Sequence, residues 1–436
     1  MRYHKIDNQF FTANRKNFSE KIKNASIALF VSNDEYPRNG DQFFPFRQSS
    51  DLFYLSGIDQ EKSFLMLAPD CPNPKLREVL FILKTNEQMT IWNGHKYTLD
   101  EAREISGIEN VHWVDEMDMM LREAASYAQN IYLNAYEYPK YATDVETGEQ
   151  RFIKEIRQLF PLHIFERSAP ILYALRMIKS DIEIDLLKQA CEITNKAFRR
   201  TLRFVKPGVM EFEVQAEIEH EFTRNRANGH GYYPIIASGK SACTLHYIEN
   251  DKECQDGDVL LFDFGAEYAN YSADMSRSIP VNGKFTDRQK AVYQAVLRTL
   301  NVLTENMLVG ASLDDLDKLS KKLIEKELID LGLFTAEEVK NQDPKEPLYK
   351  KYFMHGVNHH LGLDVHDVGE RHVPLAAGMV LTCEPGIYIP EENLGIRLEN
   401  DILITENGPF NLMENIPLEI EEIEDLMTKK TMTSIL

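Results

Sequence analysis

The chain has 436 residues, of which 43% are hydrophobic and 27% charged, and this apolar content is enough for more than one core. Its formal net charge of -20 argues against a nucleic-acid partner, because a polyphosphate backbone would repel an acidic surface. The five scattered cysteines form no CxxC pair, and neither a signal-peptide core nor an apolar run of about 20 residues occurs, so we expect a cytoplasmic protein that makes no membrane contact.

The first part of the chain alternates between strand-like and helix-like segments. Apolar runs at 27–31, 79–83 and 130–134 are typical of strands, and polar stretches such as 98–108 are compatible with helices. This alternation predicts an α/β domain. A break near Ser168-Ala169-Pro170 ends the pattern, so we assign residues 1–172 to an N-terminal domain and residues 173–436 to a second domain.

A long amphipathic helix is expected to begin the second domain. Ser180 is the expected N-cap, Glu183 completes a capping box, and apolar residues then recur at helical spacing. Further helical periods cover 291–307 and 315–331, and the strand candidates are 232–239, 258–279, 378–389 and 395–405. This order predicts an α+β domain with a largely antiparallel sheet. The charged stretch 334–352 contains two prolines and is predicted to be an exposed loop.

Two carboxylates interrupt the strand region 258–279. If this region folds as a hairpin with Tyr268 and Ala269 at its tip, Asp263 and Asp274 face each other with Cβ atoms roughly 5 Å apart. Opposed like charges destabilise a strand pair unless a positive group neutralises them, which favours a bound cation. A bulge that turns one aspartate to solvent is the alternative, and the pair alone does not decide between them.

Histidines are concentrated in the segment that follows. Five of the chain's 12 histidines occupy this segment: His355, His359, His360, His366 and His372. The first two are four residues apart, but Gly356 stands where the HExxH motif requires a glutamate, which excludes a zincin helix. A single histidine is more often structural than functional, whereas this density favours a functional role, since imidazole is the common acid or base near neutral pH.

Two glutamates lie on the last strand-like runs. Pro385 holds Glu384 extended, and period two places Arg397, Glu399 and Asp401 on one face. A glutamate on a strand usually faces solvent, and Glu399 in isolation would be expected to do so. Together, four carboxylates and one imidazole without thiolates suit hard or borderline divalent ions in a two-metal site.

The second domain carries four ordered motifs that resemble those of the "pita-bread" metallopeptidases, in the branch of aminopeptidase P (Xaa-Pro aminopeptidase) and prolidase. These motifs are LLFDFGAEYANYSADMSRS, HGVNHHLGLDVHD, TCEPGIYI and GIRLENDI. Residues 36–58 and 91–102 resemble the N-terminal domain of aminopeptidase P, so the likeness covers nearly the whole chain. It implies an aminopeptidase P-like accessory domain at 1–172 and a pita-bread catalytic domain with a curved, largely antiparallel sheet at 173–436.

The resemblance also implies roles for individual residues. The implied ligands of two divalent ions are Asp263, Asp274, His359, Glu384 and Glu399. Asp274 and Glu399 would bridge the ions, of which manganese is expected and cobalt, zinc or iron are alternatives. Glu384 would also move a proton to the leaving nitrogen. The matching outer-shell catalytic histidines are His246 and His366, and the residues that match the proline-ring pocket are His355, Arg397 and Tyr388.

These features predict an Xaa-Pro aminopeptidase that acts on peptides with proline at the second position and forms a homo-oligomer, a dimer or a tetramer. Prolidase is the alternative within the family, because it uses the same five ligands but cleaves only dipeptides; the N-terminal segments favour aminopeptidase P. A metal-free binding protein of this fold is a second alternative, as is a creatinase-like amidinohydrolase. Both are less favoured, because those relatives work without the ligands that this chain retains.

Overall fold

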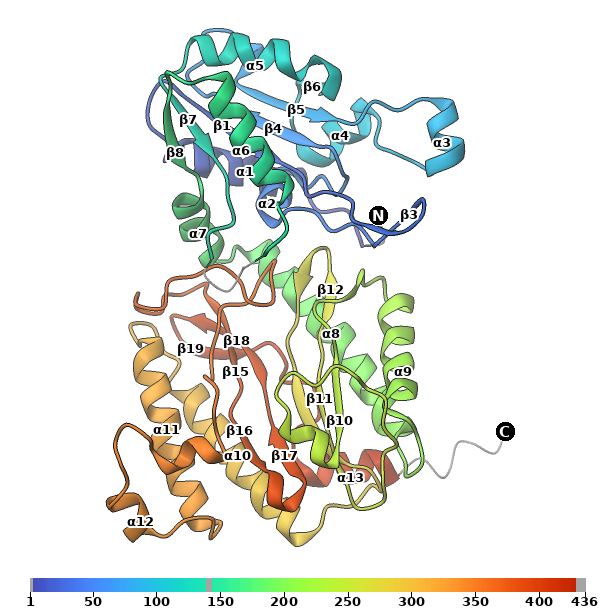
Figure 1. The fold of residues 1–436 in the computed structure, drawn as a ribbon, viewed down its shortest axis with the longest axis vertical. Helices are drawn as coiled ribbons and strands as arrows, with labels where there is room; N and C mark the ends of the chain where they lie inside the picture. Colours follow the sequence, from blue (N-terminus) through green and yellow to red (C-terminus); the bar gives the residue numbers. More distant parts are fainter. Residues whose placement is uncertain (1–2, 139–142, 429–436) are drawn as a thin grey trace. The chain divides into compact units, whose positions relative to one another are not determined.

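The computed structural model describes residues 3–138 and 143–428 of the chain (Figure 1). It divides into two units, one of His4–Arg176 and one that comprises Tyr3 and the chain from Met177 onward. The change from one unit to the other falls at the end of helix α7 (Ala169–Met177), whereas the sequence places the domain boundary between residues 172 and 173. None of the helices in the described ranges combines the length and the apolar character that crossing a bilayer requires.

A six-stranded mixed sheet organises the first unit. In spatial order its strands are β6 (Val111–Trp113), β5 (Glu78–Ile82), β4 (Phe64–Leu67), β1 (Ser26–Val31), β7 (Asn130–Leu133) and β8 (Ile164–Arg167). The strand β1 pairs antiparallel with β4 and parallel with β7. The other elements are the helices α1 (Asn8–Ser19), α2 (Ser50–Ser56), α3 (Glu87–Asn93), α4 (Leu99–Ser106), α5 (Met117–Ser126) and α6 (Gly148–Leu159) and the hairpin β2 (Pro37–Asn39) and β3 (Gln42–Phe43). The three predicted strands are β1, β5 and β7, which confirms the α/β prediction.

A cluster of charged and polar side chains lies inside the first unit. Arg176 Nη1 donates to Asp51 Oδ1 over 2.7 Å, and both side chains are buried. Asn134 Nδ2 joins the two acids of the cluster, because it lies 2.9 Å from Asp51 Oδ2 and 3.1 Å from Glu149 Oε1. Burial and the negative charge of Asp51 raise the pKa of Glu149 to about 8. Glu149 therefore keeps its proton in the folded protein at pH values where the unfolded chain has lost it.

Replacement of Glu149 by glutamine should change how stability depends on pH. Since the folded-state pKa of Glu149 lies above its unfolded value, wild-type stability falls as pH rises from about 4.5 to about 8. The Glu149→Gln variant lacks this loss, so its melting temperature should exceed that of the wild type by a margin that grows to several degrees between pH 5 and pH 8. Thermal unfolding at both pH values measures the margin. The control is Glu155→Gln, which alters an exposed glutamate of the same helix, and an equal pH trend in Glu149→Gln and wild type would contradict the prediction.

Long helices enclose the strands of the second unit. Helix α8 begins directly after Ser180, and Glu183 Oε2 accepts the backbone N–H of Ser180 over 2.8 Å, as the predicted capping box requires. The predicted helices 291–307 and 315–331 are present as α10 and α11. The helices of this unit are α8 (Asp181–Phe204), α9 (Glu211–Arg224), α10 (Asp287–Glu305), α11 (Leu313–Asp330), α12 (Ala336–Lys340) and α13 (Ile420–Thr428).

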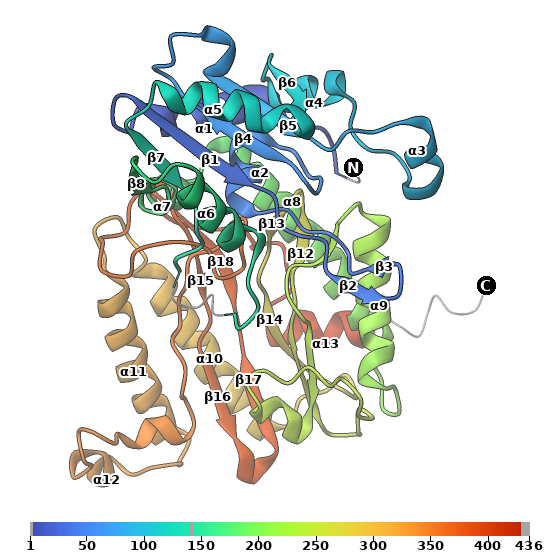
Figure 2. The ribbon, with the colours of Figure 1, turned by 45° about the horizontal axis from the view of Figure 1, so that its top comes forward.

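The strands of the second unit form small antiparallel sheets in two halves. The first half, residues 177–280, contains β9 (Gly229–His230), β10 (Ile235–Ser238), β11 (Val259–Asp263), β12 (Ala266–Tyr268), β13 (Tyr271–Ser272) and β14 (Ser276–Pro280). The second half, residues 281–428, contains β15 (Val380–Cys383), β16 (Gly386–Ile389), β17 (Leu394–Arg397), β18 (Asn400–Thr405) and β19 (Gly408–Asn411). In Figure 2, α8 and α9 lie beside the strands of the first half, α10 lies beside those of the second, and α11 packs against α10. The pairings confirm an α+β domain with antiparallel sheets.

The hairpin of the first half differs in register from the prediction. Its tip is at Ala269 and Asn270, which both adopt the left-handed conformation with φ of 52° and 64°, and not at Tyr268 and Ala269. Two central residues with positive φ make the tight turn that matches the twist of paired strands. Asp263 consequently pairs with Ser276, so the predicted direct opposition of Asp263 and Asp274 is wrong. The two carboxylates are diagonal neighbours, which are still within reach of each other.

The charged stretch 334–352 is only partly the exposed loop that the sequence predicts. Most of its polar side chains are exposed, but Ala336–Lys340 forms helix α12 and Tyr352 is buried. The carbonyl of Tyr352 accepts the backbone N–H of Tyr388 in β16 over 2.9 Å. The end of this stretch therefore packs beside a residue of the predicted proline-ring pocket.

Candidate metal centre

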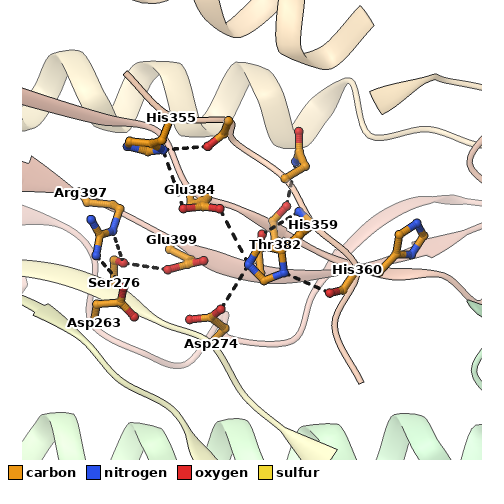
Figure 3. Close-up of polar contacts among 12 residues, drawn as sticks. Asp263, Asp274, Ser276, His355, His359, His360, Thr382, Glu384, Arg397 and Glu399 are labelled. Carbon is orange, nitrogen blue, oxygen red and sulfur yellow. Dashed lines mark hydrogen bonds and ion pairs between the residues drawn. The ribbon is translucent and has the colours of Figure 1, made fainter. Parts of the chain in front are cut away.

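Four carboxylates and one histidine converge where the two halves of the second unit meet (Figure 3). They are Asp263 and Asp274 of the first half and His359, Glu384 and Glu399 of the second. Asp263 is the last residue of β11, and the other three acids lie between consecutive strands. Each carboxylate therefore lies where regular strand pairing ends. Ligand atoms of Asp274, His359 and Glu399 all lie within 4.8 Å of one another. The structure therefore brings together all five predicted ligands, with these three at the centre.

The orientation of His359 leaves one ring nitrogen for the carboxylates. Its Nδ1 lies 3.0 Å from the carbonyl oxygen of His360, and since a carbonyl only accepts, Nδ1 carries the proton. Its Nε2 faces Asp274 Oδ2 at 3.4 Å and Glu384 Oε1 at 3.8 Å. Burial alone would lower the pKa of His359, but the hydrogen bond with Asp274 and the charge of Glu384 outweigh burial and raise it. This is the arrangement in which an imidazole binds a cation through Nε2 while Nδ1 fixes the ring.

The acids of the site carry more negative charge than their protein neighbours neutralise. Burial raises the pKa of Glu384 to about 7 against the lowering effect of the charges of His359 and Arg397. Burial, together with the neighbouring carboxylates, raises the pKa of Glu399 well above its usual range, and burial raises that of Asp263 although Arg397 opposes it. A buried cluster of acids in this state gains free energy from bound cations. Four carboxylates and one imidazole without a thiolate form a donor set that fits two divalent ions.

Tyr232 is a member of the site that sequence reasoning missed. Its hydroxyl oxygen lies 2.6 Å from Asp263 Oδ1 and 2.6 Å from Asp274 Oδ1, so it joins the two aspartates whose direct opposition was predicted. Burial raises the pKa of Tyr232 well above its usual range, which keeps the hydroxyl protonated. Tyr232 reaches the site because Ile235 pairs with Asp263, which brings the residues before β10 to the end of β11, and no local sequence pattern signals this pairing.

Three predicted pocket residues form a directed chain of hydrogen bonds beside the acids. Arg397 Nη1 donates to Tyr388 Oη over 3.0 Å, and Tyr388 Oη lies 2.8 Å from His355 Nε2. His355 Nδ1 lies 2.7 Å from the carbonyl of Gly356, so Nδ1 carries the proton and Nε2 accepts from Tyr388. Burial and the charge of Arg397 lower the pKa of His355 to about 4, which keeps its ring neutral at physiological pH. Arg397 Nη2 also donates to Asp263 Oδ2 over 2.5 Å, so the chain ends on a predicted ligand.

The two predicted outer-shell histidines lie outside the buried group. The ring of His366 stands perpendicular to that of His359, with centroids 4.5 Å apart, and its side chain is exposed. His246 is also exposed, and its charge contributes to the lowered pKa of His355. Both imidazoles therefore lie near the site and in contact with solvent.

Two family models match this chain. The model of metallopeptidase family M24 matches residues 185–406, and that of the aminopeptidase P N-terminal domain matches residues 11–132. The Xaa-Pro aminopeptidase of Escherichia coli (strain K12) is 35% identical over 440 residues, which cover 97% of this chain and 98% of that protein.

Solved structures of similar proteins agree over nearly the whole length. Pseudomonas aeruginosa aminopeptidase PepP superposes with a TM-score of 0.89 at 29% identity and covers 98% of this chain and 99% of its own. Zinc-substituted E. coli aminopeptidase P in complex with product gives a TM-score of 0.87 at 32% identity, with the same coverage. Both units therefore have counterparts in these proteins.

Proposed function

Because the chain belongs to metallopeptidase family M24 and carries the N-terminal domain of aminopeptidase P, we propose that it is an Xaa-Pro aminopeptidase. It releases the N-terminal residue from peptides that have proline at the second position. The observation that carries this proposal is the convergence of Asp274, His359 and Glu399, with Asp263 and Glu384 beside them, in a chain whose relatives bear that name.

The five converging residues are proposed to hold two divalent ions, with Asp274 and Glu399 shared between them. When bound, such ions act as Lewis acids that activate a water and polarise the scissile carbonyl. Manganese is the proposed metal; an E. coli relative has also been solved in a zinc-substituted form. The support for the pair of ions is the donor set itself, four buried or half-buried carboxylates with one imidazole.

Glu384 is proposed to move the proton from the attacking water to the leaving nitrogen. A group that transfers a proton must lie within reach of both the atom that loses it and the atom that receives it. Its carboxylate lies between the proposed metal ligands and the proposed ring pocket, with Oε1 3.8 Å from His359 Nε2 and Oε2 3.9 Å from His355 Nδ1. It therefore reaches both the metal ligands and the pocket residues.

The proline ring is proposed to bind against His355, Tyr388 and Arg397. The bond before proline has no N–H, so peptidases that bind an extended backbone fit it poorly and a ring pocket supplies the recognition instead. The hydrogen-bond chain of these three residues fixes their orientation before substrate binds. His246 and His366 are proposed to donate to the oxyanion of the tetrahedral intermediate from the solvent side.

Location and assembly are also proposals. All five cysteines lie among the described residues and are free thiols, which supports a reducing compartment such as the cytoplasm. A homo-oligomer, a dimer or a tetramer, is proposed from the family resemblance alone. Light scattering coupled to size-exclusion chromatography measures its mass.

A pair of peptides distinguishes aminopeptidase P from prolidase. With manganese present, an Xaa-Pro-Xbb tripeptide should be hydrolysed with a kcat/KM at least about tenfold above that of the matching Xaa-Pro dipeptide, since binding contacts to the extra residue raise kcat/KM. Liquid chromatography of the released amino acid measures both rates. The Xaa-Ala-Xbb tripeptide is the control for the ring pocket. Activity on the dipeptide alone would favour prolidase, and binding without hydrolysis of either peptide would favour a non-catalytic binding protein.

A further inference from the structure

Asp274 lies at a position of the hairpin where its backbone N–H points away from the neighbouring strand. The bond from Ala273 N–H to the carbonyl of Ala266, 3.0 Å long, leaves Asp274 opposite Gly265 in a pair that exchanges no main-chain hydrogen bonds. The two strands are close here, because a Cβ on Gly265 would lie 1.6 Å from the carbonyl oxygen of Ala273. The outward N–H of Asp274 therefore needs a partner from elsewhere in the molecule.

That partner is Asp401, on strand β18 of the other half. Asp401 Oδ2 accepts the Asp274 N–H over 3.1 Å and also the thiol of Cys191, whose Sγ is 3.4 Å away. The Asp401 side chain is completely buried. Its other oxygen, Oδ1, has no hydrogen-bond partner within the described part of the chain. A buried carboxylate with only one oxygen in use is costly, which calls for a function beyond packing.

The bond belongs to a seam that joins the two halves. Along this seam, Asp274 contacts Asp401, and Ser276, two residues later, contacts Glu399, two residues earlier. The two segments therefore run antiparallel with the two-residue step of paired strands. The Glu399 N–H donates to the carbonyl of Ser276 over 3.0 Å, which is a main-chain bond. At Asp274 the corresponding acceptor is the side chain of Asp401. Both candidate bridging ligands are thus fixed by this seam, one from each half.

We propose that Asp401 is a positioning residue for the metal centre. Its carboxylate would hold the backbone of Asp274 in place beside Glu399, the other residue that is proposed to be shared between the two ions. This inference rests on the proposed metal-dependent function. Asp401 is not itself in the group of converging ligand atoms, so it acts through Asp274. Partners of this kind orient ligands and typically change metal affinity by about 10–100-fold when they are lost.

The test is manganese binding to the metal-free, full-length protein by isothermal titration calorimetry. Asp401→Leu keeps a similar shape but has no acceptor, so it should weaken binding by about 10–100-fold. Asp401→Asn retains an oxygen that accepts the Asp274 N–H, so it should remain within about threefold of the wild type. Cys191→Ala is the matched control, because it removes the other donor to Oδ2 and leaves the Asp274 bond intact.

Each outcome of the titration decides the proposal. Unchanged manganese affinity in Asp401→Leu overturns the proposal. An equal loss of affinity in Asp401→Asn also overturns it, because the effect would then come from the charge of Asp401. An equal loss in Cys191→Ala overturns it as well, because the effect would then come from packing. If thermal melting shows that Asp401→Leu does not fold, Asp401→Ser takes its place, since its shorter side chain does not reach Asp274. Absence of manganese binding in the wild type would overturn the proposed metal-dependent function itself, whereas a binding wild type with equally binding variants overturns the role of Asp401 alone.

Discussion

Replacement of Glu384 by glutamine is expected to lower kcat on an Xaa-Pro-Xbb tripeptide by about 10²–10⁴-fold. Glutamine matches the shape of glutamate, but its amide cannot take a proton from water and return it to a leaving nitrogen. The acid it replaces lies within 4 Å of both His355 and His359. No other carboxylate of the site contacts both histidines in the described residues, so no neighbour compensates for the loss.

Steady-state kinetics at saturating manganese separate this effect from a loss of metal. KM is expected to change less than kcat, because a group that acts mainly in the transition state lowers kcat. The control is Glu406→Gln, which alters an exposed glutamate after β18. A kcat within tenfold of the wild type would contradict the role of Glu384.

Replacement of Asp274 by asparagine is expected to have opposite effects on function and stability. Metal affinity should fall by about 100-fold or more and activity should fall with it, because one charged ligand of the central group is lost. The metal-free protein should melt a few degrees higher, because one member of a buried group of like charges becomes neutral. Such opposition is typical of residues kept for function at the expense of stability.

Calorimetric titration and thermal unfolding, both started from the metal-free protein, measure the two effects. Asp330→Asn, at the exposed end of α11, is the matched control and should change neither. An Asp274→Asn variant that binds manganese like the wild type would remove Asp274 from the ligand set. A lower melting temperature would show that the acids of the metal-free site do not repel one another strongly.

Sequence patterns correctly predicted those helices and strands whose formation is determined by residues close together in the chain. The start of α8 follows from Ser180 and Glu183 because a capping box involves only residues three apart. The strands β1, β5 and β7 follow from short apolar runs. The four candidate carboxylate ligands stand out because they interrupt apolar runs, a signal that is visible in the sequence, whereas the family resemblance singled out His359.

Long-range pairing could not be predicted in the same way. Moving the hairpin tip by one residue, from Tyr268 and Ala269 to Ala269 and Asn270, shifts every cross-strand partner by two residues, and this replaced the expected partner Asp274 by Ser276. Tyr232 reaches the site through contacts with residues 31 and 42 positions away, and Asp401 contacts a residue 127 positions away. No local pattern reports such contacts. The identity of the metal also depends on cellular supply, which the chain does not encode.

The contact between Arg397 and Asp263 would couple the proposed metal site to the proposed ring pocket. The Asp263 carboxylate belongs to the proposed metal ligands and also accepts a hydrogen bond from Arg397. Arg397 in turn donates to Tyr388, which donates to His355. Cation binding to Asp263 would therefore change the strength of the hydrogen bonds from Arg397 to Asp263 and to Tyr388 and of that from Tyr388 to His355. Coupling of two binding sites is reciprocal. If bound ions change the affinity for a ligand in the proposed ring pocket by some factor, that ligand changes the affinity for the ions by the same factor. If both proposed sites bind their ligands, we expect metal titrations of this protein to differ with and without a proline-containing peptide.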